Sequence, residues 1–140
     1  YRPSNPKKYK GDSKNIIYRS LWERKFMNYC DLNENILEWA SEEFWIPYLD
    51  PTTNRVRRYF PDFFIKYKDK DSNIRRSVIE VKPMRETLQP KATKGKSRKT
   101  MINESMTYVK NQAKWKAARE FCDDRKLEFK IMTEKELGIR

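Results

Sequence analysis

Two short apolar runs with embedded charges constrain this chain more than any other feature. The first, residues 59–65, contains Asp62, and the second, residues 78–82, contains Glu80 and Lys82. β-Branched and aromatic residues dominate both runs, so each is predicted to be a strand. Side chains two positions apart on a strand share a face, so Glu80 and Lys82 are predicted to point the same way. If the two strands pair, Asp62 lies beside them, and two carboxylates and an ammonium meet at one place.

The alternation of side chains also predicts which residues of these runs face the core. Ile79 and Val81 are predicted to point away from Glu80 and into the core. The first run is predicted to carry Phe60, Asp62 and Phe64 on one face and Tyr59, Phe63 and Ile65 on the other. Charged side chains within strongly apolar strands normally need a reason. Asp62 and Glu80 are therefore candidate functional residues.

Length and charge predict one basic domain with an anionic partner. The 140 residues fit a single domain, 1–140, that is long enough to bury a core. Lys and Arg number 32 against 20 Asp and Glu, which gives a net charge of +12. A folded, strongly basic chain suggests a polyanionic partner such as DNA. Charge alone also allows a basic protein without any nucleic-acid role.

Absent residue types narrow the chemistry further. The sequence has no His, which excludes Ser-His-Asp and Cys-His catalysis, histidine bases and His-ligated zinc. Cys30 and Cys122 are too few for a zinc site and are predicted to be buried free thiols. Scattered glycines form no phosphate-cradling loop, so no nucleotide cofactor is expected. We find no apolar run of transmembrane length and no signal peptide, and expect no membrane partner and an intracellular, reducing setting.

Two helices are predicted from periodicity. The first runs from Ile16 to about Cys30 and has a broad apolar arc. Glu23 falls inside this arc, where a carboxylate is costly unless it is paired or binds a metal. Glu23 is therefore a candidate functional residue, and the alternative is an ion pair with Arg19, four residues earlier. The second helix is predicted over residues 101–121, with a buried stripe of Ile102, Met106, Val109, Ala113, Ala117 and Phe121.

Four strands complete the predicted fold. Residues 36–48 and 55–67 are predicted to form a hairpin, and residues 74–82 to form a third strand. Residues 126–132 alternate in polarity and are predicted to be the last strand, and Thr133 then opens a capping-box pattern. The order α-β-β-β-α-β predicts an α/β sandwich with a mixed sheet between two helices.

Two basic segments are predicted to contact a phosphate backbone. Residues 1–15 combine Pro, Gly, aromatic and basic residues, and are interpreted as an N-terminal arm or, equally, as a solvated tail. Residues 84–100 lack apolar periodicity and are interpreted as a mobile flap over nucleic acid or as a disordered loop. The candidate DNA contacts in these segments are Lys7, Lys8, Lys10, Arg85, Lys91, Lys94, Lys96, Arg98 and Lys99.

The predicted cluster suits phosphodiester hydrolysis. That reaction needs an activated water, neutralisation of the transition-state charge and stabilisation of the leaving oxygen. Mg²⁺ held by one or two carboxylates supplies these functions and keeps positions for water and phosphate. A nearby Lys holds the attacking water and offsets negative charge. Each motif is weak alone, because Glu-x-Lys on a strand is commonly a solvated pair, but together they favour a nuclease.

At this point the sequence resembles a known family. The segments Tyr18-Arg19-Ser20-Leu21-Trp22-Glu23, Tyr59-Phe60-Pro61-Asp62-Phe63 and Ile79-Glu80-Val81-Lys82 resemble the PD-(D/E)xK nuclease superfamily. The opening Tyr-Arg-Ser-x-x-Glu and the ending Thr133-Glu134-Lys135-Glu136-Leu137 are most similar to its TnsA-like endonuclease branch. Nearly end to end, the chain is also similar to the head completion nucleases of T-even-type tailed bacteriophages.

The resemblance implies a restriction-endonuclease-like core and an Mg²⁺-dependent DNA endonuclease, in which Mn²⁺ can substitute. Asp62 and Glu80 would be metal ligands with the Val81 carbonyl, Lys82 the catalytic lysine, and Glu23 a supporting carboxylate. Family members often place a polar residue on the helix after the Glu-x-Lys strand, where the candidates here are Gln112 and Lys114.

The phage resemblance implies work on the end of packaged DNA during head completion, before tail attachment. It further implies head, portal or neck proteins as partners. The host cytoplasm during assembly, or the head–neck region of the virion, would be the location. The alternatives are a non-catalytic plug or connector that binds DNA and portal, and a basic RNA-binding module whose aromatics stack bases.

Overall fold

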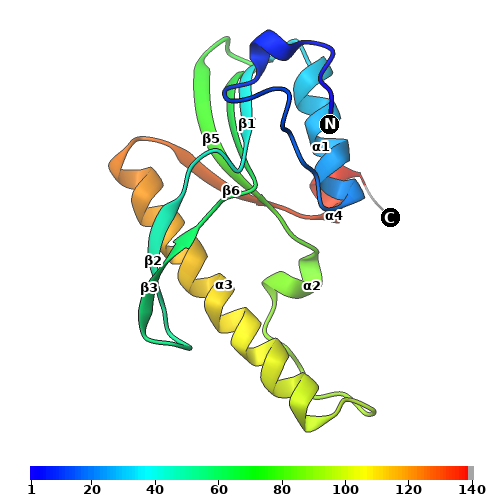
Figure 1. The fold of residues 1–140 in the computed structure, drawn as a ribbon, viewed down its shortest axis with the longest axis vertical. Helices are drawn as coiled ribbons and strands as arrows, with labels where there is room; N and C mark the ends of the chain where they lie inside the picture. Colours follow the sequence, from blue (N-terminus) through cyan, green and yellow to red (C-terminus); the bar gives the residue numbers. More distant parts are fainter. Residues whose placement is uncertain (139–140) are drawn as a thin grey trace.

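A computed structural model of the chain describes residues 1–138 (Figure 1). The bounds of its elements are η1 Pro6–Lys8, α1 Leu21–Leu32, β1 Ile36–Ser41, β2 Ile46–Asp50, β3 Arg55–Tyr59, β4 Phe63–Lys68, β5 Ile74–Val81, α2 Met84–Thr87, α3 Arg98–Asp124, β6 Glu128–Met132 and α4 Glu134–Leu137. None of the helices in this part of the chain is both long and apolar enough to cross a membrane.

Within residues 1–138, four strands form one mixed sheet in the order β1-β4-β5-β6. β1, β4 and β5 are antiparallel neighbours, whereas β6 runs parallel to β5. Strands β2 and β3 pair separately as a two-stranded antiparallel ribbon, which lies beside α3 in Figure 1. The predicted mixed α/β architecture is confirmed.

Each of the two main helices covers its own hydrophobic cluster. α1 contributes Phe26 and Met27 to a cluster that contains Ile79 of β5. α3 contributes Trp115 to a second cluster, against which Phe129 of β6 packs. Side chains alternate across a sheet, so α1 and α3 lie on opposite faces, as the sandwich prediction requires.

The predicted hairpin is present, but each of its long strands is divided in two. Trp39 of β1 lies opposite Ile65 of β4, and Ile46 of β2 lies opposite Tyr59 of β3. Between these pairings the chain leaves the sheet at residues 60–62. Tyr59 is consequently buried in the α3-side cluster. Its predicted placement on the face of Phe63 and Ile65 is wrong, because the chain changes direction before β4 begins.

The first helix begins at Leu21, five residues later than predicted. Ser20 is its N-cap, and the Oγ of Ser20 accepts a hydrogen bond from the backbone N–H of Glu23 at 3.1 Å. Such a cap satisfies one of the amide groups that the first turn leaves without a partner. Ile16 is still buried, but outside the helix, and Tyr29 of the predicted apolar arc is 51% exposed.

The long helix α3 is covered only along the C-terminal half of the predicted apolar stripe, where Ala113, Ala117 and Phe121 are partly buried against the second cluster. Its buried residues are Asn111, Trp115, Ala118 and Cys122. Ile102, Met106 and Val109 of the predicted stripe are exposed instead. Figure 1 shows the reason, since the N-terminal end of α3 extends beyond the sheet and has no layer to pack against. Only the part of α3 that reaches the ribbon and β6 is covered.

The N-terminal arm packs on the C-terminal end of α1. The Nζ of Lys8 donates to the carbonyl oxygens of Cys30, Asp31 and Asn33 at 2.7, 3.1 and 2.9 Å. The backbone N–H groups of Ser4 and Asn5 donate to the buried carboxylate of Asp31. A cation at the end of a helix also interacts favourably with the helix dipole. The arm is therefore anchored, and the solvated-tail interpretation is wrong.

The predictions for the two cysteines and for the capping box are confirmed, and that for the flap is confirmed in part. Cys30 and Cys122 are free and buried, as predicted. Thr133 and Glu136 form the predicted capping box at the start of α4. The predicted flap at residues 84–100 is less uniform than expected, because it contains α2 and the first turn of α3, with residues 88–97 outside helices and strands.

Candidate active site

The adjacent ends of β4 and β5 bring Asp62 and Glu80 together. Phe63, the first residue of β4, pairs with Ile79 of β5, so Asp62 lies beside the last residues of β5. The backbone N–H of Val81 donates to the Oδ2 of Asp62 at 2.8 Å. A side-chain hydrogen bond thus replaces a strand-to-strand one at this position and holds the Asp62 carboxylate against β5.

Glu80 points to the α3 side of the sheet and is almost completely buried. The hydroxyl of Tyr59 donates a hydrogen bond to the Oε2 of Glu80. The Nζ of Lys82 lies 3.9 Å from the other oxygen, Oε1. The Lys82 side chain is 28% exposed and that of Glu80 only 7% exposed. Lys82 therefore lies between the buried carboxylate and solvent, where an incoming anion would meet it.

Neighbouring cations and hydrogen-bond donors only partly compensate the negative charges of Asp62 and Glu80. Burial, followed by the charge of Glu80, raises the pKa of Asp62 to about 8, although the Val81 N–H and Lys82 act in the opposite direction. Burial also raises the pKa of Glu80, despite the opposing effects of Tyr59 and Lys82. Perturbed carboxylates of this kind are characteristic of functional sites. A bound cation would offset the cost of burying the two charges, and at Asp62 also the repulsion from Glu80.

Glu23 approaches this site from the first turn of α1. It is half-buried, and its negative charge contributes to the raised pKa of Asp62. The Oε2 of Glu23 accepts a hydrogen bond from the backbone N–H of Arg19 at 3.2 Å. The guanidinium of Arg19 binds Glu42 instead, at 2.6 Å. The alternative of a Glu23–Arg19 ion pair is therefore wrong, because the Arg19 guanidinium pairs with Glu42 and not with Glu23.

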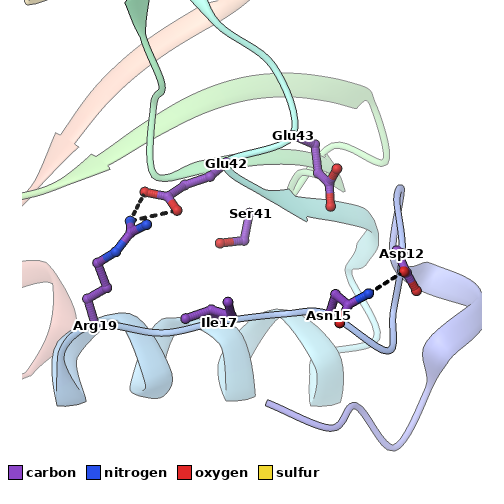
Figure 2. A pocket seen from close by; sticks show the side chains of 7 residues that line it. All are labelled: Asp12, Asn15, Ile17, Arg19, Ser41, Glu42 and Glu43. Atoms are coloured by element: carbon purple, nitrogen blue, oxygen red, sulfur yellow. Dashed lines mark hydrogen bonds and ion pairs between the residues drawn. The ribbon is translucent and has the colours of Figure 1, made fainter.

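The Arg19–Glu42 ion pair borders a hollow of about 360 Å³ (Figure 2). Both oxygens of Glu42 accept from the Nη1 of Arg19, and the backbone N–H of Glu42 donates to the carbonyl oxygen of Asp62 at 3.2 Å. The ion pair thus ties the segment before α1 to the backbone at Asp62. The hollow is lined by Asp12, Asn15, Ile17, Arg19, Ser41, Glu42 and Glu43. Acidic side chains predominate there, so it does not suit a phosphate.

Lys114 reaches the site from α3. Its Nζ lies 5.8 Å from the ring centroids of both Tyr48 and Tyr59. Burial lowers the pKa of Lys114, while the charge of Glu80 acts in the opposite direction. Lys114 is thus a second ammonium near Glu80. Gln112 is half-buried, and no hydrogen bond described within residues 1–138 joins it to the carboxylates.

The residues fit an open divalent-metal site rather than a closed cage. Within the described part of the chain, no group of three or more carboxylate or thiol side chains is arranged to hold a metal. Asp62 is half-buried and Glu80 is buried, and neighbouring groups offset the negative charge of these two carboxylates only in part. Mg²⁺ is typically bound by one or two carboxylates and keeps several waters, so this donor set suits it.

A second Glu-x-Lys motif lies one strand away and provides an internal comparison. On β6, the Oε1 of Glu128 accepts a hydrogen bond from the hydroxyl of Tyr67 at 2.7 Å and lies 3.9 Å from the Nζ of Lys130. The Glu128 side chain is 32% exposed and also pairs with Arg75. Neither a second carboxylate nor deep burial accompanies it in these contacts. A Glu-x-Lys motif with a tyrosine donor therefore does not by itself create a site of this kind.

The predicted DNA contacts of the arm and flap divide into occupied and exposed cations. Lys8 is bound to the end of α1, as described above. Lys10 lies 3.6 Å from Glu38, and Lys96 lies 2.9 Å from Glu104. The exposed cations are Lys7, Arg85, Lys91, Lys94, Arg98 and Lys99.

Tyr59 is the residue of this site that sequence reasoning missed. The alternation of its run assigned it to the opposite face, whereas it donates to Glu80. The break at residues 60–62 between β3 and β4 causes the difference. The sequence did contain a signal of this break, because residues 41–43 form a polar interruption in the other strand of the predicted hairpin, residues 36–48.

Comparisons with known proteins identify the family of this chain. Residues 33–134 match the model of the family described as "TnsA-like endonuclease N terminal". The chain therefore belongs to the TnsA-like endonuclease family, and its mixed α/β fold is consistent with a restriction-endonuclease-like core. Asp62, Glu80 and Lys82 lie within the matched residues, whereas Glu23 precedes them.

A particular relative extends this similarity over almost the whole chain. The protein named "Head completion nuclease" of Enterobacteria phage T4 is 39% identical over 135 residues. The alignment covers 94% of this chain and 87% of the phage protein. The aligned share of the chain is larger than the family match, so the similarity extends into the residues that precede residue 33.

Proposed function

We propose that this chain is an Mg²⁺-dependent DNA endonuclease whose active site is built from Asp62, Glu80 and Lys82. The observation that carries the proposal is the pair of carboxylates at the adjacent ends of β4 and β5, one half-buried and one buried, with raised pKa values and an ammonium 3.9 Å from one of them. Membership of an endonuclease family supports it. The 140 residues act together as a single nuclease domain.

Each residue has a defined role in this proposal. Asp62 and Glu80 would hold the metal together with the carbonyl oxygen of Val81, and Glu23 would support this site from α1 by orienting water. When bound, Mg²⁺, or Mn²⁺ in its place, would supply an activated water and offset charge on the phosphate. Lys82 orients the attacking water and stabilises negative charge on the phosphate oxygens.

The T4 relative suggests the biological setting. By analogy with its name, we propose that the chain acts in head completion, on the end of packaged DNA before tail attachment. Head, portal or neck proteins would then be its partners, and the host cytoplasm its location during assembly. Loss of infectious yield with a cleavage-dead variant would support this setting, whereas a normal yield would favour a non-catalytic plug.

A metal titration tests the enzymatic part of the proposal. Linear duplex, branched duplex, single-stranded DNA and RNA are incubated with the protein while Mg²⁺ is varied or chelated. We expect DNA cleavage that appears with Mg²⁺ or Mn²⁺ and stops with the chelator. Cleavage that persists after complete chelation would rule out the metal-dependent mechanism, and cleavage confined to RNA would rule out DNA as the substrate.

We propose that DNA binds along the exposed cations of the N-terminal arm and the flap, and that it also contacts Gln112 and Lys114 of α3. Two neighbouring lysines test it, since Lys7 is exposed and Lys8 is bound to the end of α1. Lys7→Ala is expected to weaken DNA binding and to reduce its salt dependence by about one counterion, with unchanged melting temperature. Lys8→Ala is expected to cost about 1–2 kcal/mol of folding stability, because three carbonyls lose their donor.

Fluorescence anisotropy at several salt concentrations and thermal unfolding measure both effects. A Lys7→Ala variant that binds DNA with unaltered affinity and salt slope would remove the arm from the proposed path. Equal thermal stability of the Lys8→Ala variant would contradict the anchoring role.

A further inference from the structure

Tyr59 engages one of the two carboxylate oxygens of Glu80 in a hydrogen bond. The tyrosine hydroxyl donates to the Oε2 of Glu80, while Oε1 faces Lys82. Tyr59 is only 3% exposed and packs with Ile46 and Trp115 in the α3-side cluster. Its ring cannot turn away without disturbing that cluster, so the hydrogen bond is a fixed feature of the site.

Asp62 is restricted in the same manner. Its Oδ2 accepts the backbone N–H of Val81 at 2.8 Å, which leaves Oδ1 as its unrestricted oxygen. Both carboxylates are therefore held so that each presents one oxygen. The two donors come from different elements, the ribbon strand β3 and the sheet strand β5, and both are part of the fold rather than of a flexible loop.

We propose that Tyr59 is a specificity-determining positioning residue, which selects Mg²⁺ over Ca²⁺ by keeping Glu80 a one-oxygen ligand. This inference rests on the proposed metal-dependent function. Mg²⁺ is small, prefers octahedral coordination and retains waters, so single carboxylate oxygens suffice. Ca²⁺ takes six to eight oxygens and commonly gains them from two-oxygen carboxylates. A Glu80 whose second oxygen is held by Tyr59 withholds one of those oxygens from Ca²⁺.

The test is the ratio of Ca²⁺ to Mg²⁺ dissociation constants, measured by calorimetry on DNA-free protein. In Tyr59→Phe the ring remains and only the donor is lost. We expect Ca²⁺ to bind more tightly while Mg²⁺ affinity changes little, so that the preference for Mg²⁺ falls about three- to tenfold. Tyr48→Phe is the matched control, because Tyr48 lies in the same cluster and under the same Lys114 ammonium. Its ratio is expected to equal that of the wild type.

An infrared measurement on the wild type keeps the inference falsifiable if Tyr59→Phe does not fold. A one-oxygen carboxylate ligand separates its antisymmetric and symmetric stretching bands more widely than a two-oxygen ligand. We expect the wide separation in the Mg²⁺-loaded protein. A narrow separation, or an unchanged Ca²⁺-to-Mg²⁺ ratio in Tyr59→Phe, overturns the inference and leaves the proposed function standing. A wild-type protein that binds neither ion overturns both.

Discussion

Replacing Asp62 by Asn is expected to abolish cleavage and, at the same time, to stabilise the metal-free protein. The cleavage rate should fall by at least about 10³-fold, because a metal ligand worth several kcal/mol of transition-state stabilisation is lost. The stability gain has the opposite sign because Asp62 is costly in the folded state. Burial and the charge of Glu80 raise its pKa to about 8, and a neutral amide of the same size avoids that cost.

The stability gain expected for Asp62→Asn increases with pH. An unfolded Asp has a pKa near 3.9, so between about pH 4 and pH 8 the folded protein holds a proton that the unfolded chain has lost. The contribution of Asp62 to the stability of the metal-free protein is greatest below its pKa in the unfolded chain. This contribution is lost as the pH rises through its pKa in the folded protein. Near pH 7.5 we expect Asp62→Asn to be more stable by about 1–2 kcal/mol, and near pH 5 by much less.

Thermal unfolding with a chelator at several pH values measures this difference. Asp69→Asn is a suitable control, because hydrogen bonding to Arg75 lowers the pKa of Asp69 and its removal should destabilise the fold. Mg²⁺ should raise the melting temperature of the wild type and have little effect on Asp62→Asn. A metal-free Asp62→Asn protein that is less stable than the wild type at pH 7.5 would show that the carboxylate is a structural group.

The strands that carry the site could be predicted from the sequence because their chemistry is local. β-Branched and aromatic residues surround Glu80, and alternation alone puts Ile79 and Val81 on the opposite face, where both are buried. The pairing of β4 with β5 follows from the short charged turn between them. Asp62 and Glu80 could therefore be placed side by side without any knowledge of the helices.

The parts that could not be predicted depend on contacts between distant elements. Tyr59 turns to the α3 side because the ribbon separates from the sheet, and no periodicity within residues 59–65 records that separation. How much of α3 is covered is decided by where the sheet ends, which leaves Met106 exposed although it lies on a regular apolar stripe. The start of α1 was accessible in principle, since Ser20 and Glu23 have the spacing of a capping box.

The two Glu-x-Lys motifs predict very different results from the same substitution. Lys82→Ala is expected to lower the cleavage rate by about 10²–10³-fold, the usual cost of removing a group that stabilises transition-state charge. Lys130→Ala is expected to change the rate by less than about twofold, because exposed ion pairs contribute little. Both lysines lie 3.9 Å from their glutamates and both glutamates bind a tyrosine, so the comparison isolates the surroundings.

The two Glu-x-Lys motifs differ in how deeply the glutamate is buried and in whether a second carboxylate lies beside it. The side chain of Glu80 is 7% exposed and that of Glu128 is 32% exposed, and only Glu80 has Asp62 beside it. Single-turnover cleavage and calorimetric Mg²⁺ binding should be measured on both variants. Because Lys82 is not proposed as a ligand, its removal should leave Mg²⁺ binding intact while the rate falls. Equal losses in the two variants would mean that the lysines act through general charge, and the catalytic role of Lys82 would then have to be abandoned.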